Sequence, residues 1–341
     1  MKTKWKKRLP LIIIVLIVCM VYLHYENTTL QITTYSLLDE NIPKEFDNYK
    51  IVQISDVHNT KSKKLITDLV EAVKEQQPNI IVLTGDLIDA SRTDIQAAVN
   101  LVEQLQTIAQ VYFVSGNHEA SIENYSELKK QLKEKQVVVL DNKAETLQIG
   151  DETIQLIGLD DPSMVYDPYV PEKSILLGHL ENMNYDNNQY CILLSHRPEL
   201  YDTYIEMGMN LVLSGHAHGG QIRIPFLGGV IAPNQRLFPK YTSGMFQTGK
   251  TTMVVSRGIG NSILPFRINN RPELVVVELE QSSPKAKAKL TITRKNKRKA
   301  KGLIKKINHL AFLFMFYQQQ NLLQLGKHPW FAWLFLFYAQ M

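Results

Sequence analysis

Residues 51–58 read IVQISDVH, an apolar and β-branched run that leads directly into a serine, an aspartate and a histidine. A short run of this kind is typical of a buried strand. In α/β proteins, ligands bind outside the carboxyl ends of strands, where these polar residues lie. This stretch therefore predicts a strand and, after it, a functional loop.

Similar runs recur along the chain and predict buried strands at residues 51–54, 80–83, 111–114, 137–140, 154–158, 192–194, 211–213, 253–255 and 274–277. Between the early runs, apolar residues spaced near the helical period predict helices at residues 62–76, 94–107 and 122–135. This alternation predicts an α/β fold. After Val137 the strands are punctuated by Gly and Pro and the helices become fewer, which predicts a second sheet with antiparallel character.

Composition excludes several classes of protein. The 341 residues are 45% hydrophobic and 21% charged, which excludes a disordered, collagen-like or disulfide-scaffold chain. This length allows one domain or two. Both cysteines, Cys19 and Cys191, lie in apolar runs, so no disulfide is predicted.

Charge is distributed unevenly along the chain. Five basic residues and no acid precede Pro10, and twelve basic residues and no acid follow Pro284. Between them lie 33 carboxylates and 21 Lys and Arg side chains, a formal charge of −12. An acidic body is a poor surface for nucleic acid, so no nucleic-acid partner is expected. Basic ends beside apolar segments favour an anionic membrane surface.

The N-terminus combines a basic flank with the apolar run LIIIVLIVCMVYL at residues 11–23. This run is short for a span of about 20 residues, and a cleaved signal peptide has the same form. Because residues 21–25 are all bulky, cleavage is disfavoured and we expect an uncleaved, single-pass transmembrane anchor. The excess of basic residues before it would place the body outside the cytoplasm, at the cell membrane.

The composition changes again after Glu280. These changes predict four parts: the basic flank and anchor at 1–25, the folded body at 26–281, a basic linker at 282–309 and an apolar, aromatic tail at 310–341. The aromatic residues of the tail are of types found at membrane interfaces. A tail without a role is the alternative.

Polar residues follow nearly every predicted strand of the body. They are Asp56, His58, Asp86, Asp89, Asn117, His118, His196, His216 and His218. Carboxylate and imidazole ligands suit Mn, Fe or Zn, and there are enough of them for two divalent metal ions. The Asp56-x-His58 and His216-x-His218 pairs would direct both side chains to one face of an extended backbone. Flanking glycines would let the chain turn tightly around a metal.

This ordered set, D-x-H, G-D-x-x-D, G-N-H-E, H and G-H-x-H, resembles the calcineurin-like metallophosphoesterases over about residues 30–280. The longer texts GHAHGGQIRIPFLGG and NNRPELVV are similar to its membrane-associated bacterial branch, related to UDP-2,3-diacylglucosamine pyrophosphatase. The resemblance implies a four-layer αββα sandwich.

Site roles follow from the same resemblance. It implies that one metal is held by Asp56, His58, Asp86 and His218, and the other by Asp86, Asn117, His196 and His216. A hydroxide bridging the metals would attack the phosphorus in line. His118 would protonate the leaving oxygen, Asp89 would orient His118, and Glu119 has a weaker claim to a role.

One departure from the family pattern concerns substrate. Protein Ser/Thr phosphatases have an arginine after the second motif, where this chain has Ala90 and Ser91, which argues against a phosphoprotein substrate. The cations that grip phosphate are then expected among Arg197, Arg257, Arg267 and Arg271, each of which could instead form a surface ion pair.

Three functions remain open. The first is a membrane-anchored hydrolase of phosphodiester or pyrophosphate bonds in a lipid- or nucleotide-linked substrate. The second is a tethered phosphodiesterase for soluble nucleotides. The third is a catalytically silent, metal-binding scaffold or envelope-binding module. No protein partner is implied.

Overall fold

The computed structural model describes residues 2–165, 167, 169–235, 237–261 and 264–282. The chain through Gln281 forms one compact unit. The predicted basic linker and apolar tail lie outside the described residues, except for Ser282.

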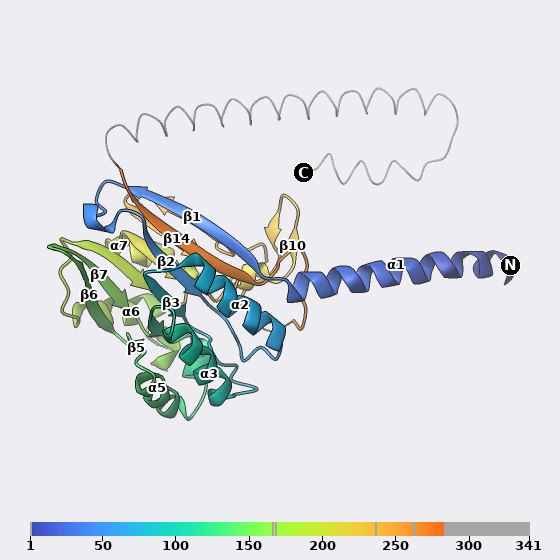
Figure 1. The fold of residues 1–341 in the computed structure, drawn as a ribbon, viewed down its shortest axis with the longest axis horizontal. Coiled ribbons are helices and arrows are strands. Elements are labelled where there is room, and N and C mark those ends of the chain that lie inside the picture. The colour runs from blue at the N-terminus through green and yellow to red at the C-terminus, as the bar shows by residue number, and fades with distance from the viewer. Residues whose placement is uncertain (1, 166, 168, 236, 262–263, 283–341) are drawn as a thin grey trace, which may run out of the picture. The chain divides into compact units, whose positions relative to one another are not determined.

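The first of two six-stranded sheets carries most of the predicted N-terminal strands (Figure 1). Its strands lie in the order β1 (Gln31–Asp39), β14 (Glu273–Gln281), β2 (Tyr49–Ile54), β3 (Ile80–Thr84), β4 (Gln110–Val114) and β5 (Val138–Val139). All neighbouring strands pair in parallel except β14 and β2. The carboxyl ends of β2, β3 and β4 therefore share one edge of the sheet.

The second sheet is parallel at its centre and antiparallel at both edges. Its order is β12 (Gly244–Thr248), β13 (Thr251–Val255), β9 (Leu211–Ser214), β8 (Tyr190–Leu194), β7 (Glu152–Gly158) and β6 (Lys143–Ile149). Only the outer pairs, β12 with β13 and β6 with β7, are antiparallel. The predicted antiparallel character holds only there, because helices connect β7 to β8 and β8 to β9 and so allow parallel pairing.

Two helices of the body begin after a capping side chain. The helices of the body are α2 (Lys63–Gln76), α3 (Ile95–Gln106), α4 (Asn117–Ala120), α5 (Tyr125–Glu134), α6 (Glu172–Glu181) and α7 (Tyr201–Glu206). Ser62 Oγ accepts the N–H of Leu65 at 3.3 Å, and Asp94 Oδ1 accepts that of Ala97 at 2.9 Å. Both caps satisfy donors that the first turn leaves free. Four 3₁₀ turns are Lys44–Phe46, Pro162–Met164, Pro198–Leu200 and His218–Gly220.

Three apolar cores separate the layers. In the first core, Leu69 of α2 and Val102 of α3 pack with Ile81 of β3. The second lies between the sheets and joins Val82 of β3 to Ile192 of β8. A third joins the second sheet to α6 and α7 and contains, among others, Leu193, Val212, Leu176 and Tyr204. The order is thus helices, sheet, sheet and helices, and the predicted α/β class is confirmed.

The N-terminal helix α1 (Lys2–Thr28) meets the body at its last turns. Asn27 and Glu26 bond to the backbone of Arg267 and Asn270. In the part of the chain that the structure describes, no helix combines the length and the hydropathy needed to cross a membrane.

A small hairpin, β10 (Arg223–Ile224) with β11 (Gly228–Gly229), forms a separate sheet.

Candidate metal centre

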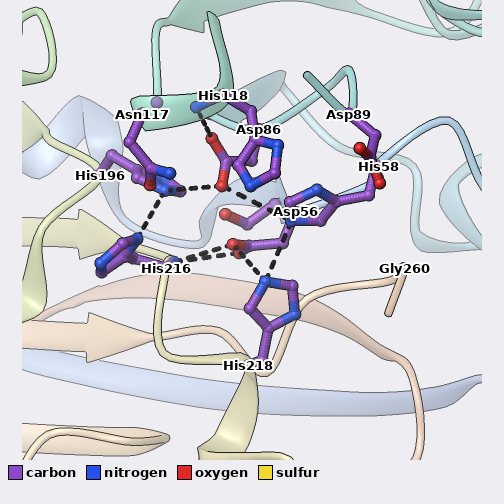
Figure 2. A network of polar contacts seen from close by, with 12 residues as sticks. Asp56, His58, Asp86, Asp89, Asn117, His118, His196, His216, His218 and Gly260 are labelled. Carbon is purple, nitrogen blue, oxygen red and sulfur yellow. Dashed lines mark hydrogen bonds and ion pairs between the residues drawn. The ribbon is translucent and has the colours of Figure 1, made fainter. Parts of the chain in front are cut away.

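The predicted ligands lie in five loops that follow strands or, for Asn117 and His218, in the short helical turn at the end of the loop, and their side chains converge (Figure 2). These loops follow β2, β3, β4, β8 and β9 and carry Asp56, His58, Asp86, Asn117, His196, His216 and His218. Two groups of side chains bring their ligand atoms within 4.8 Å of one another: Asp56, His58, Asp86 and His218, and Asp86, His196 and His216. Asp86 belongs to both groups.

The backbone of these loops is turned, whereas the sequence predicted it to be extended. Asp56, His58, Asp86, His216 and His218 have φ values of 53°, 49°, 53°, 65° and 46°. Left-handed backbone is uncommon for residues other than glycine and costs energy. The turn is needed because side chains two residues apart on an extended strand run parallel, whereas metal ligands must converge on a point.

Two glycines permit the loops to approach closely. A Cβ on Gly116 would collide with the carboxylate of Asp86, and one on Gly215 would collide with Ser55 and Asp56. Both positions therefore require glycine for packing around the ligands.

In the first group, ring nitrogens face each other with no other side chain between them. Nε2 of His58 lies 3.0 Å from Nε2 of His218 and 3.5 Å from Oδ2 of Asp86. Nε2 of His218 lies 3.3 Å from Oδ1 of Asp56. All four side chains are buried.

The second group is built around the other side of Asp86. Nε2 of His196 lies 3.2 Å from Oδ2 of Asp86 and 3.2 Å from Nδ1 of His216. Nδ1 of His196 lies 2.7 Å from the carbonyl oxygen of Thr84, to which it can only donate, so Nε2 is the nitrogen that faces the centre. Oδ1 of Asn117 is buried without a hydrogen-bond partner, although Figure 2 shows its side chain beside His196.

Burial governs the protonation of most of these groups. It lowers the pKa of His58 to about 4 and holds the pKa of His216 and His218 well below the usual value, so these rings are neutral and able to bind a cation. Burial also raises the pKa of Asp56 to about 6. For His196, burial acts downward, but the charges of Asp86 and Asp56 outweigh it and raise the pKa to about 10.

The donor set fits two divalent cations. Facing imidazole nitrogens cannot satisfy each other unless one carries a proton, and the orphaned oxygen of Asn117 needs a positive partner. Carboxylate oxygen, amide oxygen and imidazole nitrogen together are ligands of transition metals. The His/Asp cluster is thus able to bind two divalent metal ions.

His118 lies beside the ligands without belonging to either group. Its ring meets that of His58 edge to face, with centroids 4.4 Å apart. The backbone N–H of Ala90 donates to Nδ1 of His118 at 3.0 Å. An Nδ1 that accepts a hydrogen bond is unprotonated, so in the neutral ring Nε2 carries the proton. The free N–H of His118 is therefore a proton donor next to the centre.

Asp89 does not make the contact with His118 that the sequence led us to expect. Oδ1 of Asp89 accepts from the N–H and Oγ of Ser91 at 2.9 and 2.6 Å, and Oδ2 accepts from Nε of Arg92 at 3.2 Å. Burial acts to raise the pKa of Asp89, but these hydrogen bonds prevail and lower it to about 2. The backbone N–H of Ala90, and not this carboxylate, bonds to the ring of His118.

Glu119, for which the sequence supported only a weak claim to a role, is completely buried. Its Oε2 accepts the N–H groups of Asp86 at 2.8 Å and Gly116 at 2.7 Å, and its Oε1 accepts that of Ile88 at 3.1 Å. Burial, followed by the charge of Asp86, raises its pKa to about 7. Glu119 thus ties together the loops after β3 and β4.

Glu199 is a second residue that the sequence did not reveal. Both of its carboxylate oxygens are buried without a hydrogen-bond partner, and Oε1 lies 3.8 Å from Nε2 of His216. Since Nδ1 of His216 faces the centre, Nε2 is the nitrogen left to face a carboxylate. Such pairs orient a ligating histidine.

The arginines predicted to grip phosphate have partners in the protein. Arg197 pairs with buried Asp161, its Nη2 lying 2.8 Å from Oδ1, although its Nη1 has no hydrogen-bond partner. Arg257 bonds to Glu273, and Arg267 bonds to backbone carbonyls. Arg271 bonds to Tyr25 and Gln31. Nη1 of Arg197 also lies 3.5 Å from Oε1 of Glu199, so each of these four arginines already has partners within the protein.

Comparison with known proteins agrees with this geometry. The family described as "Calcineurin-like phosphoesterase" matches residues 49–220. The uncharacterized metallophosphoesterase YkuE of Bacillus subtilis (strain 168) is 32% identical over 265 residues, which cover 76% of this chain and 89% of that protein. Phosphodiesterase YaeI of Escherichia coli (strain K12) is 28% identical over 237 residues, covering 68% and 82%.

A mammalian protein is also similar. The Bos taurus "Transmembrane protein with metallophosphoesterase domain" is 30% identical over 262 residues, which cover 73% of this chain and 57% of that protein. The matched family region contains every residue of both ligand groups. The chain belongs to the calcineurin-like phosphoesterase family.

Proposed function

We propose that this metal-dependent phosphohydrolase cleaves a phosphodiester or pyrophosphate bond in a lipid- or nucleotide-linked substrate close to a membrane. The observation that carries the proposal is the position of His118, a half-buried imidazole on α4 that belongs to neither ligand group and keeps its Nε2 proton free. A group in this position can protonate a leaving oxygen, which a catalytically silent scaffold does not need.

The residues divide the work between holding ions and moving a proton. Asp56, His58, Asp86 and His218 would hold one ion, and Asp86, Asn117, His196 and His216 the other. When bound, two such ions neutralise phosphate charge and lower the pKa of a water molecule. Glu119 keeps the loops of both groups in register, and His118 delivers a proton to the oxygen that leaves.

The charges around the centre favour a diester or pyrophosphate over a monoester. A terminal phosphate carries close to two negative charges at neutral pH, whereas a phosphodiester carries one. Each of the four arginines considered already has a partner within the protein, so they offer little charge to a doubly negative phosphate. YaeI, a relative, carries the name phosphodiesterase.

The membrane part of the proposal rests on α1. Apolar side chains on all sides of this helix are exposed, among them Ile14, Leu16, Val18 and Val21. A helix that is apolar all round is stable only in apolar surroundings. We take this helix as an N-terminal anchor with the body outside the cytoplasm. The Bos taurus relative is named as a transmembrane protein, which supports this proposal. Mn²⁺ is the proposed metal, in keeping with the mixed ligands.

Turnover by the full chain, solubilised in detergent, tests the activity. We expect Mn²⁺-dependent hydrolysis of bis-p-nitrophenyl phosphate and of a UDP-linked pyrophosphate, faster than that of p-nitrophenyl phosphate, and none in EDTA. His118→Ala should lower kcat about 10²–10⁴-fold without releasing metal. His24→Ala, a substitution of an exposed histidine in α1, is the matched control. Full metal loading without turnover of any substrate would instead support the scaffold.

A further inference from the structure

Seven large apolar side chains are exposed together beside the hairpin β10–β11. This apolar rim consists of Ile224, Phe226, Leu227, Ile231, Leu237, Phe238 and Phe266. Backbone bonds join its segments: the N–H of Arg223 donates to Ile268 at 3.0 Å, and the N–H of Phe238 donates to Val230 at 2.9 Å. The rim is therefore one surface and not a set of scattered side chains.

The most exposed residue of the rim is held in a strained conformation. Phe226 is fully exposed at 102% and has φ 71°, and Phe238 is 55% exposed with φ 56°. Left-handed backbone is unfavourable for a bulky residue, and nothing inside the protein covers Phe226. Backbone strain that no packing inside the protein offsets is typical of residues that act on another molecule.

The chain around the rim carries charge of one sign only. From Met207 to Pro272 there is no Asp or Glu, although this stretch contains seven Lys and Arg residues. This contrasts with the acidic body as a whole. A basic segment with exposed aromatic and aliphatic side chains matches the surface of a bilayer that contains anionic lipids.

The rim is continuous with the C-terminal part of α1, whose apolar side chains are exposed. Tyr22 Oη donates to Oδ1 of Asn269 at 2.6 Å, and Nδ2 of Asn269 donates to the carbonyl of Arg223 at 3.1 Å. Figure 1 shows β10 next to the end of α1 that meets the body. One residue thus joins the apolar helix to the hairpin, so both can meet the same apolar phase.

The same segments hold a ligand of the metal centre. Nδ2 of Asn270 donates to the carbonyls of His218 and Gln221 at 2.8 and 3.1 Å. Arg267, which follows Phe266 of the rim, places Nη2 at 3.4 Å from Nδ1 of His218. The rim and the catalytic loop after β9 are therefore parts of one hydrogen-bonded structure.

We propose that the apolar rim inserts into the interfacial layer of a phospholipid bilayer containing anionic lipids and so holds the metal centre at the level of the headgroups. A second copy of the chain, or another segment of this chain, is the other possible cover. The bilayer is favoured because the rim continues into α1 and because the stretch of chain that carries the rim, from Met207 to Pro272, contains no acidic residue. This binding rests on the membrane part of the proposed function, the anchor role of α1, but not on the proposed hydrolysis, and it would explain a lipid-linked substrate.

Tryptophan fluorescence in the full chain tests the insertion directly. Phe226→Trp places a reporter on the rim, and Tyr169→Trp, at a residue 92% exposed before α6, is the matched control. Each chain is reconstituted in vesicles of equal parts phosphatidylglycerol and phosphatidylcholine, with or without doxyl-labelled lipid. The parent chain, with Trp5, Trp330 and Trp333, supplies the background to be subtracted.

We expect the fluorescence of Trp at position 226 to be blue-shifted and to be quenched at least about twofold by doxyl lipid. The fluorescence of Trp at position 169 should show neither the blue shift nor the quenching. A water-like, unquenched signal at position 226 would overturn the proposal. So would a blue shift without quenching, because it would mean that protein covers the rim.

A second pair of variants separates docking from catalysis. Phe226→Asp with Leu237→Asp should lower hydrolysis of a bilayer-embedded lipid pyrophosphate about tenfold or more, because two apolar contacts with lipid are lost. Hydrolysis of soluble bis-p-nitrophenyl phosphate should remain within about twofold, as should both activities of Tyr169→Asp. Equal loss on both substrates would overturn the docking role. If the parent chain cleaves no substrate, the proposed function fails, while the fluorescence result still decides the insertion.

Discussion

Asn27, in the last turn of α1, forms two hydrogen bonds with the backbone of Arg267: its Oδ1 accepts the N–H at 2.7 Å, and its Nδ2 donates to the carbonyl at 3.1 Å. Arg267 in turn lies against the metal ligand His218. The end of the helix is thus part of the structure that supports the metal centre.

Removing this contact should weaken the body. Asn27→Ala is expected to lower the free energy of unfolding by about 1–3 kcal/mol, because it leaves two backbone groups of Arg267 without partners. Urea denaturation followed by circular dichroism measures the change. Thr28→Ala, which removes only a bond to the carbonyl of His24 within the helix, is the control. Equal stabilities of the two variants would show that the helix end does not support the body.

Glu119→Gln should disturb both loops that it joins. The carboxylate accepts three backbone N–H groups, and an amide would direct its own N–H groups at one or more of them. We expect the free energy of unfolding to fall by about 2–4 kcal/mol and the affinity for Mn²⁺ to fall with it. Glu123→Gln, at an exposed site nearby, should change stability by less than about 0.5 kcal/mol. A Glu119→Gln variant as stable as this control would contradict the bridging role.

Glu199→Gln tests the carboxylate behind His216. Because a partner of this kind orients the ring and increases its basicity, its loss should lower Mn²⁺ affinity about 10–100-fold. Titration calorimetry on the full chain gives the value. Glu172→Gln is a close control, since Glu172 also lies near Arg197, at 3.7 Å, but has no contact with His216 among those of the described residues. Metal affinity unchanged by Glu199→Gln would exclude the orienting role.

Stability should also depend on pH through Asp160. Burial, with the neighbouring Asp141, raises the pKa of Asp160 to about 8, above the value of about 3.9 in an unfolded chain. Between these values the folded protein binds more protons than the unfolded one, so the free energy of unfolding falls as pH rises.

Asp160→Asn removes this titration and keeps one acceptor oxygen, which can serve either Ser115 or Asn142. The decline in unfolding free energy between about pH 5 and pH 8 should therefore be shallower than in the parent chain, by roughly 2 kcal/mol at the alkaline end. Asp151→Asn, at an exposed position, should leave the slope as it is. A parallel decline in Asp160→Asn and the parent would contradict the assignment.

The strands that were predicted from the sequence are those buried on both faces. β2, β3 and β4 present unbroken apolar runs because the first core covers one face and the second core the other. β1 and β6 were missed: their side chains alternate between exposed and covered, and Thr and Glu interrupt the apolar pattern. At the metal centre, the ligand residues were readable because each motif is short and follows a strand.

The contacts that support these ligands could not be predicted from the sequence. No feature of the text GNHE tells whether Glu119 faces water or three backbone N–H groups, because that depends on how two loops meet. The partner of His118 is a backbone N–H, which every residue possesses and which no motif marks. The extended backbone predicted for D-x-H and H-x-H was wrong for a related reason, since convergence required turns.

The position of β14 has a consequence for biosynthesis. This strand is the last of the body, yet it fills the gap between β1 and β2. While the ribosome is still making the chain, β1 and β2 have no partner between them until residues 273–281 have emerged, and both edges stay open to other nascent strands. Glu273 also holds Arg257, whose carbonyl holds Arg267 beside His218. The nascent protein therefore completes its metal centre only after its whole body has been synthesised.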